Sequence, residues 1–495
     1  MDSMFDPESH VAITVATTHN ERLSDELQAT ARLLIANSQK LIMSVDSEIA
    51  QLQAMMDDLH GQRDRHVAHT QQYRTAIAPH RKLPVDLLEE IFISCAENPV
   101  HVPPEPTQFP WTVIQVCSKW RSVAHALPGL WSHIEAHFYD DDLFLRCLRL
   151  VERVFLSSAH LPISLNATID YDAADDHVVE FAKLLSSYAP AFEHLEISGP
   201  FSSVKSLMSL PPGSIENLQS LGLHDVEDYS GQIYDFPVLR DAPKLRNLMI
   251  SFAMPPYMTL DNLPFPQLTH LSIQQTDVDS ALAFSILSLC RSLVDCVLEF
   301  QAGDIEGQSE AASPLIDHTL PALERLHLQV TGFLLDVAWF PHLELPSLVS
   351  FAFSASGNRA WLPSWTPMIT RSGRLESLVL YSPINPVLLE EILATSPALM
   401  RLDLHISTLS ENILMGMSTG DLVPRLTSLI CAVDLVEVLP SHLEMLQTRK
   451  QGTNSVSHIA EVVFTHTHPF ASDEASVRRV HQLAEEGWNI SFWRL

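Results

Sequence analysis

One short phrase, Leu-x-x-Leu-x-Leu/Ile, returns throughout the chain from about residue 190 onward. Six full copies begin at Leu218, Leu245, Leu268, Leu323, Leu375 and Leu399, and looser copies begin at Phe192, Leu293, Leu348 and Leu426. The central apolar residues of successive copies lie 23 to 30 residues apart. A period of this size is typical of an array in which each copy is one small structural unit.

Each copy offers a short strand whose alternate apolar residues point inward, followed by a segment that returns on the outer side. One copy cannot bury its apolar face alone, so neighbouring copies must stack into a continuous core. We expect helices in some of the returns, such as residues 281–290 and 387–395. An ordinary α/β sheet built from the same strands is the alternative.

The phrase resembles that of leucine-rich repeats. The resemblance implies an α/β fold, a solenoid with a parallel concave sheet over residues 191–455, and a last repeat with a C-terminal cap over 456–495. In that tail we expect a helix at 472–486 between residues 459–464 and 488–493, together forming a last irregular repeat and a cap. The copies lack the Asn or Cys that usually follows the strand, and a proline often precedes it, as at Pro243, Pro266, Pro321, Pro346 and Pro397. We therefore expect a less regular strand register.

A second feature is the concentration of large apolar residues between Leu83 and Ile134. Leu87, Leu88, Ile91 and Phe92 are spaced as on one helix face, and residues 113–126 predict a second amphipathic helix. Helices this short are unstable alone in water. The apolar groups exceed what about fifty residues can bury, which indicates a partner surface.

The order Leu-Pro, Leu-Leu, Ile-Phe, Val-Cys-x-x-Trp-Arg and Leu-Pro-x-Leu-Trp resembles the F-box, which docks proteins onto the Skp-type adaptor of cullin-RING ubiquitin ligases. The resemblance covers residues 80–136 and implies an adaptor-binding set. That set is Leu83, Pro84, Leu87, Leu88, Ile91, Phe92, Val116, Cys117, Trp120, Leu130 and Trp131. It departs from the family at residues 97–110, where five prolines exclude a regular helix. The alternative is that these residues form the core of a small helical cap on the repeat array.

The N-terminal segment has its own pattern. Residues 1–20 lack periodicity and are expected to be disordered, whereas residues 21–79 predict a helical segment. In this segment Ile42, Val45, Ile49, Leu52, Met56 and Leu59 follow the a/d spacing of a coiled coil. Self-association through residues 42–59 is one interpretation; the others are a helix folded back on its own domain and a hairpin broken near Ser38 or Gly61. Residues 137–190 predict a helical linker and the N-terminal cap of the solenoid, with helices at 143–156 and 178–187.

Composition narrows the classes of function. Thirty basic against 60 acidic residues give a net charge of −30, which disfavours nucleic acid as a partner. The first eighteen residues lack the features of a secretory signal, and no run of eighteen apolar residues indicates a membrane span. The six cysteines are far apart and fit buried free thiols better than disulfides or a zinc site. We expect a soluble protein of the cytoplasm, the nucleus or both.

The sequence contains no phosphate-binding glycine loop, no Gly-x-Ser-x-Gly and no paired metal ligands. We therefore expect no catalytic residue, metal or cofactor. Polar residues beside the buried leucines predict a target-binding surface on the sheet: His224, His270, Arg325, His327, Arg401, Asp403 and His405. The resemblances together imply a substrate-recognition subunit of an SCF-type ubiquitin ligase, which binds adaptor and cullin at one end and an unknown target at the other. A ligase-independent scaffold and a hydrolase with a dispersed site are the alternatives.

Overall fold

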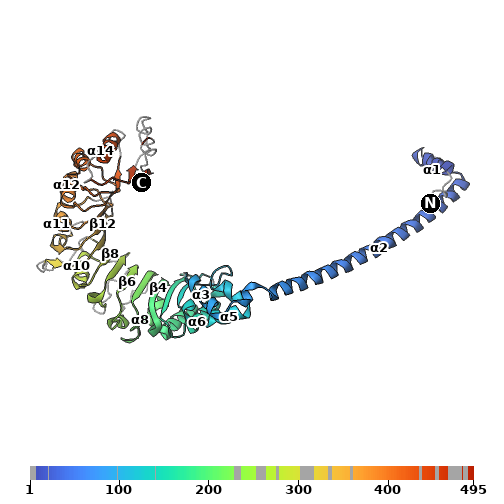
Figure 1. The fold of residues 1–495 in the computed structure, drawn as a ribbon, viewed down its shortest axis with the longest axis horizontal. Coiled ribbons are helices and arrows are strands. Elements are labelled where there is room, and N and C mark those ends of the chain that lie inside the picture. Colours follow the sequence, from blue (N-terminus) through green and yellow to red (C-terminus); the bar gives the residue numbers. More distant parts are fainter. Residues whose placement is uncertain are drawn as a thin grey trace. The chain divides into compact units, whose positions relative to one another are not determined.

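The computed structural model describes residues 7–19, 22–96, 98–139, 141–227, 236–251, 263–274, 278–301, 317–332, 337–356, 360–433, 438–451, 456–466, 482 and 489–494 (Figure 1). The chain divides into two compact units, residues 1–87 and 88–495. Helix α3, Val85–Cys95, begins in the first unit and ends in the second.

The first unit is dominated by one long helix. Helix α2 spans Asp25–Ala76, 52 residues, and the Ser24 hydroxyl at its N-cap accepts a hydrogen bond from the Leu27 N–H at 3.4 Å. Asp25 and Glu26 in its first turn suit the positive end of the helix dipole. The predicted long helix is confirmed, and it has no break near Ser38 or Gly61.

The segment expected to be disordered contains a helix, α1, at Pro7–His19. Helix α1 packs beside the start of α2, so that Ile13 shares a pocket with Ala31 and Leu34. These contacts are made between α1 and a different helix. They could not be found by searching residues 1–20 alone for a regular spacing of apolar residues. A 3-10 helix, η1, follows α2 at Pro79–Lys82.

The second unit is built on one parallel sheet of 15 strands, and each strand lies beside the preceding one in chain order. Its strands are β1 Val100–Val102, β2 His133–Phe138, β3 Ile163–Ile169, β4 Phe192–Pro200, β5 Ser220–Glu227, β6 Asn247–Ser251, β7 His270–Gln274, β8 Asp295–Gln301, β10 Arg325–Thr331, β12 Ser350–Ala355, β13 Ser377–Leu380, β14 Arg401–Leu404, β15 Ser428–Ala432, β16 Glu461–His466 and β17 Asn489–Arg494. Strands β9, His318–Thr319, and β11, Leu343–Glu344, form a separate parallel pair. The predicted α/β class, with a long N-terminal helix and a parallel sheet, is confirmed.

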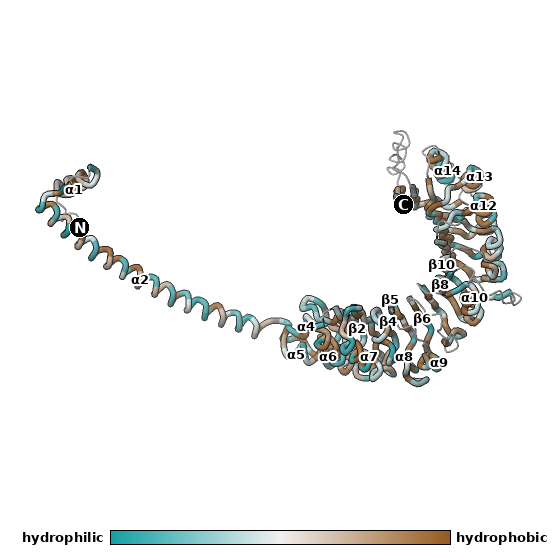
Figure 2. The backbone as a smooth tube through the Cα atoms, turned by 180° about the vertical axis from the view of Figure 1, so that it is seen from behind, coloured by the Kyte–Doolittle hydropathy of each residue, from teal (hydrophilic) through white to brown (hydrophobic). Residues whose placement is uncertain are grey.

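Helices fill many of the returns between strands, because parallel neighbours require a crossover connection. They are α4 Trp111–Val116, α5 Ser118–His125, α6 Asp141–Ser157, α7 Asp175–Tyr188, α8 Ser202–Met208, α9 Pro237–Arg240, α10 Ser280–Leu289, α11 Thr366–Thr370, α12 Pro386–Thr395, α13 Glu411–Thr419 and α14 Leu439–Gln451. Short 3-10 helices lie at Pro128–Trp131 (η2), Ala189–Ala191 (η3), Phe265–Gln267 (η5), Phe340–His342 (η6) and Pro363–Trp365 (η7). Figures 1 and 2 show these helices along one side of the sheet. Of the predicted helix at 472–486, the structure describes residue 482 alone, and the rest lies outside the described residues.

In most strands before β14, residues alternate between this covered side and the opposite side, which we call the open face; in β14 to β16 both sides are largely buried. In β10, Leu326, Leu328 and Val330 are buried, while Arg325 is exposed and His327 is half-buried. This two-residue period is the one expected for a strand with one buried face. The core therefore lies between the sheet and its helices.

A ladder of backbone hydrogen bonds links successive copies just before their strands. The Val294 carbonyl accepts from the N–H groups of Glu324 and Arg325 at 2.9 and 3.0 Å, and the Glu324 carbonyl accepts from Val349 and Ser350 at 2.8 and 2.9 Å. The same two-to-one pattern recurs from Gln219 to Thr427. Main-chain groups thus join the copies without the missing Asn side chains. The pairing of β4 shifts register on both sides, at Ile163/Ser164 and at Ser198/Pro200, whereas the described pairs from β5 to β17 have no shift, so the irregular register that we expected is limited to β4.

The sheet begins well before the repeated phrase. Strand β1 lies inside the proline-rich loop and pairs with β2, which pairs with β3. The predicted boundary between the F-box and the linker, at residue 136, falls within β2. The stretch that resembles an F-box is therefore continuous with one end of the sheet.

A buried arginine on α14, Arg449, links that helix to the residues around α13 near the C-terminal end of the second unit. The guanidinium of Arg449 on α14 is 2% exposed and donates to the carbonyls of Met417, Val423 and Ser457 at 2.7, 2.7 and 2.9 Å. Burial lowers its pKa to about 10. Three carbonyl partners offset part of the desolvation of the charge.

Candidate docking surface and open face

Phe92 is the centre of the small helical region at the start of the second unit. Its ring lies 5.3 Å from the ring of Trp120 on α5 and 6.3 Å from that of Phe109 in the proline-rich loop, both in edge-to-face geometry. Such pairs are favourable beyond the area that they bury. The loop that departs from the F-box pattern thus packs against the apolar side of α3.

Trp131 joins α5 to the sheet. Its indole N–H donates to the Ala124 carbonyl at 2.8 Å, and its ring stacks on His125 with centroids 5.2 Å apart. The ring of Trp111 meets it edge to face at 5.7 Å, and the Trp111 indole N–H donates to the carbonyl of His101 on β1 at 2.8 Å. Both indole donors are therefore used within the chain.

Four residues that the F-box resemblance assigns to the adaptor are buried by the chain itself. Leu88, Phe92, Leu130 and Trp131 are at most 4% exposed. In this structure the chain itself covers their side chains, and their assignment to the adaptor surface stays a prediction that this burial does not support. The sequence interpretation treated the stretch as two uncovered helices, whereas the proline-rich loop and the first strands of the sheet cover one side of it.

The other assigned residues remain accessible. Pro84, Leu87, Ile91 and Val116 are exposed, and Leu83, Cys117 and Trp120 are partly exposed. We call these seven the exposed motif residues. Ile93, which the sequence reasoning passed over, is more exposed still at 62%.

The predicted helix at 113–126 is two helices, α4 and α5, with a break at Cys117. Cys117 is extended, with φ −163° and ψ 170°, and the Arg121 side chain donates from Nε to the Ile114 carbonyl at 2.8 Å across the break. The periodicity of apolar residues runs through Cys117 and so could not reveal the break. Val116 ends α4 as an exposed side chain.

The predicted target-binding residues lie on or just after strands that carry the open face. His270, Asp295 and Arg325 occupy matching positions on β7, β8 and β10. The Arg325 Nε lies 2.7 Å from Asp295 Oδ2. Sequence reasoning named His270 and Arg325 but missed Asp295, the partner between them. His224 on β5 is half-buried. His327 on β10 is also half-buried, and its burial lowers the pKa of its imidazole.

A second group of predicted residues meets at β14. Asp403, 2% exposed, lies 3.3 Å from Arg401 Nη2 through one oxygen and 3.3 Å from His405 Nε2 through the other. Burial raises the pKa of the Asp403 carboxyl, and the charges of His405 and Arg401 oppose that shift. His405 also stacks on Tyr381, with ring centroids 4.6 Å apart. The predicted residues Arg401, Asp403 and His405 thus form one cluster, whereas His224 and His270 lie on other strands.

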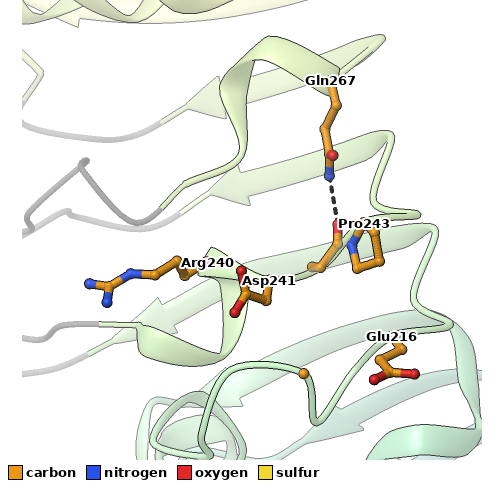
Figure 3. A pocket seen from close by; sticks show the side chains of 7 residues that line it. Glu216, Arg240, Asp241, Pro243 and Gln267 are labelled. Atoms are coloured by element: carbon orange, nitrogen blue, oxygen red, sulfur yellow. Dashed lines mark hydrogen bonds between the residues drawn. The ribbon is translucent and has the colours of Figure 1, made fainter.

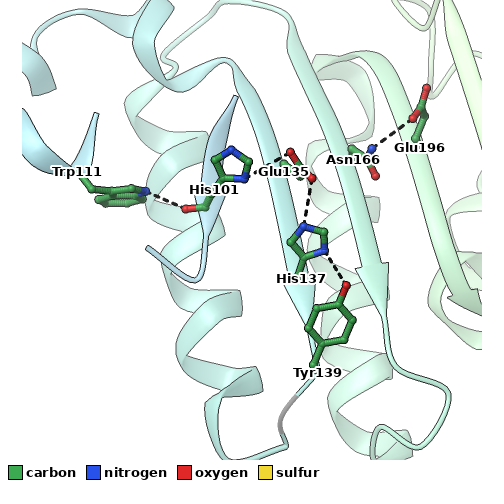
Figure 4. A network of polar contacts seen from close by, with 7 residues as sticks. All are labelled: His101, Trp111, Glu135, His137, Tyr139, Asn166 and Glu196. Atoms are coloured by element: carbon green, nitrogen blue, oxygen red, sulfur yellow. Dashed lines mark hydrogen bonds and ion pairs between the residues drawn. The ribbon is translucent and has the colours of Figure 1, made fainter. Parts of the chain in front are cut away.

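The structure adds a polar network on the first strands, shown in Figure 4. Glu135 on β2 lies between His101 on β1, at 3.4 Å, and His137, at 3.2 Å, and His137 contacts the Tyr139 hydroxyl at 3.2 Å. On β3 and β4, Asn166 donates to Glu196 at 3.4 Å. The alternation His-Ile-Glu-Ala-His at 133–137 was the available signal, but it lies before the repeated phrase and was not used.

Two pockets border the sheet. One, of about 400 Å³, is lined at β2 to β4 by residues that include His133, Asn166, His194 and Glu196. The other, of about 460 Å³, lies among the loops that precede β5, β6 and β7, and Gln267 spans two of these loops by donating to the Ala242 carbonyl at 2.6 Å (Figure 3). The first lining places Ser164 on β3 in register with His133 on β2 and His194 on β4, whereas the residues that line the second pocket include no serine, cysteine or histidine.

Within the described residues, no three side chains of His, Cys, Asp or Glu are grouped so that they could hold a metal ion. In the same part of the chain, no helix combines the length and the apolar character needed to cross a membrane. No protein-family model matches the chain, and no curated protein is similar to it.

Proposed function

We propose that this chain is a substrate-recognition subunit of an SCF-type cullin-RING ubiquitin ligase, acting in the cytoplasm, the nucleus or both. The exposed motif residues bind the Skp-type adaptor, and the second unit, an array resembling a leucine-rich-repeat solenoid, binds the target protein on its open face. Catalysis belongs to the other subunits. Holding a target lysine near the charged ubiquitin carrier makes transfer a local reaction.

The accessibility of part of the motif is the observation that carries the proposal. Ile91 on α3 and Val116 on α4 are 42% and 43% exposed. Both are apolar side chains, which water solvates poorly, and the other apolar side chains of these short helices do not cover them. Full burial of an aliphatic side chain of this kind is worth about 1.5–3 kcal/mol. Exposed groups of this kind at motif positions are suited to a protein interface, whereas the buried motif residues hold the helices in place.

The order of strands supports the target-binding half of the proposal. In the described part of the chain, parallel strands in chain order present a long row of open-face side chains, among them the paired Arg325 and Asp295 and the exposed Arg401, which contacts the buried Asp403. Stacked arrays use extended surfaces of this kind to bind proteins. The mixed charge of this face fits a polar protein target.

Binding to a purified Skp-type adaptor tests the proposal. We expect Ile91→Glu and Val116→Asp each to weaken binding at least about 10-fold, because each buries a carboxylate in place of an apolar side chain. Leu143→Asp on α6 is the matched control, since Leu143 is 41% exposed but lies outside the motif. The proposal fails if the unaltered protein does not bind the adaptor, or if the two motif variants bind as well as the control.

A ligase-independent scaffold is the second candidate, and the burial of Leu88, Phe92, Leu130 and Trp131 favours it. In that case the motif would serve as the end of the sheet and recruit no adaptor. Affinity purification from cells distinguishes the two: recovery of cullin supports the receptor, and recovery of other partners without cullin or adaptor supports the scaffold.

A further inference from the structure

Helix α2 presents a stripe of apolar side chains that the chain leaves uncovered. No residue of the helix is buried. The a/d positions Ile42, Val45, Ile49, Leu52, Met56 and Leu59 are all exposed, and we call them the free seam. Figure 2 shows apolar residues recurring along the helix. A seam at three- and four-residue spacing needs a second helix to cover it.

The free seam has a defined end on each side. Towards the N-terminus, α1 lies against the same stripe, where Ile13 and Ile35 line a pocket of about 400 Å³ that reaches the first seam residue, Ile42. Towards the C-terminus, the next seam position is Arg63, a charged and exposed side chain. The partner helix must therefore match a seam of limited length.

We propose that this partner is a second copy of the chain, and that the two α2 helices pair antiparallel about a two-fold axis between residues 50 and 51. Ile42 then faces Leu59 of the second copy, Val45 faces Met56, and Ile49 faces Leu52. All six seam positions are paired with none left over. The proposal stands apart from adaptor binding and does not depend on it.

The residues that flank the seam favour the antiparallel orientation. Leu41 and Met55 are exposed apolar side chains at g positions. Reversing one helix brings g beside g, so Leu41 packs against Met55 of the second copy. A parallel pair brings g beside e five residues later, so Leu41 would instead lie against the carboxylate of Asp46.

The charged side chains of α2 also favour the antiparallel orientation. In the antiparallel pair, Asp46 of each copy lies beside His60 of the other, which forms two favourable contacts when the histidine is protonated. Arg63 faces Ser38, whereas a parallel pair would stack Arg63 on Arg63. The unfavourable contact is Glu48 beside Glu48 at the centre, where both carboxylates are solvated. Two copies of α1 are also placed at opposite ends instead of side by side.

The mass of the full chain in solution provides the first test. We expect a dimer by light scattering, and we expect Leu52→Lys to raise the dimer dissociation constant at least about 100-fold because two lysines enter the seam. Met43→Lys is the matched control: Met43 is 72% exposed, against 64% for Leu52, but lies at a b position off the seam. A monomeric unaltered chain, or a Leu52→Lys variant as dimeric as the control, would overturn the proposal.

Disulfide cross-linking tests the orientation. In the antiparallel pair, residue 42 lies about 26 Å along the axis from residue 42 of the other copy, at 1.5 Å per residue, and opposite residue 59. A mixture of Ile42→Cys and Leu59→Cys chains should therefore form a 42–59 disulfide upon mild oxidation, identified by peptide mass. A 42–42 disulfide formed by Ile42→Cys chains alone would contradict the antiparallel arrangement.

Discussion

Replacing Trp131 by alanine should destabilise the start of the sheet, because the structure makes this residue part of the core. Loss of a buried tryptophan typically costs about 3–5 kcal/mol through the cavity and lost transfer energy. The substitution also removes the 2.8 Å hydrogen bond from the Trp131 indole N–H to the Ala124 carbonyl, at about 1 kcal/mol, and leaves that carbonyl the longer bond from the Leu127 N–H at 3.3 Å. We expect a total loss of about 4–6 kcal/mol. Trp131→Phe keeps a ring on His125 and should cost only about 1–2 kcal/mol.

Hydrogen exchange during a urea titration is the suitable assay, since stacked units open locally and a single global transition is not assured. Amides of residues 100–139 should lose protection in Trp131→Ala before those of β10 to β16. Val116→Ala is the control and should change stability by about 0.5 kcal/mol or less, because Val116 is exposed. If Trp131→Ala kept the stability of the unaltered protein and lost only adaptor binding, the assignment of Trp131 to the core would be refuted.

Three further outcomes follow from buried polar groups. Arg449→Met should lower the free energy of unfolding by about 2–4 kcal/mol in a urea titration, since three carbonyls lose the guanidinium as a donor, although Val423 keeps the Leu426 N–H, while the desolvation of one charge is relieved. Burial lowers the pKa of His442, so below about pH 6.5 the unfolded chain binds a proton that the folded chain does not. The free energy of unfolding should therefore fall as the pH drops from 7, and it should fall less steeply in His442→Phe. Urea titrations at several pH values measure both slopes. Burial raises the pKa of Cys290 and Cys431 to about 12, so iodoacetamide at pH 8 should label the exposed Cys95 and spare both until the chain unfolds, as peptide mass spectrometry would show.

The repeated phrase was sufficient to predict the strands of the large sheet from β4 to β15, but not the separate pair β9 and β11. Its central leucines, such as Leu378 and Leu402, are buried on neighbouring parallel strands, as the stacking argument required. Strands β1 to β3 were missed because their sequences lack the leading Leu-x-x. The first strand lies among prolines, and only its pairing with β2 identifies it.

The sequence likewise suggested some residues of the candidate sites and missed others. Spacing along the chain grouped Arg401, Asp403 and His405, and in the structure the first two lie on β14 and His405 directly follows it, where the three meet. It could not find Asp295 or Tyr381, since these approach Arg325 and His405 from neighbouring strands. Contacts between strands depend on register, which is set by the packing of whole copies.

By itself, the sequence determined the period of the array, the long helix and the positions of its apolar stripe, because these follow from the geometry of single strands and helices. Only the tertiary structure decided which motif residues are accessible. Leu87 and Leu88 are neighbours with the same side chain, yet one is exposed and the other is fully buried. The difference arises from what covers each face of α3, and burial of this kind is a property of the assembled chain.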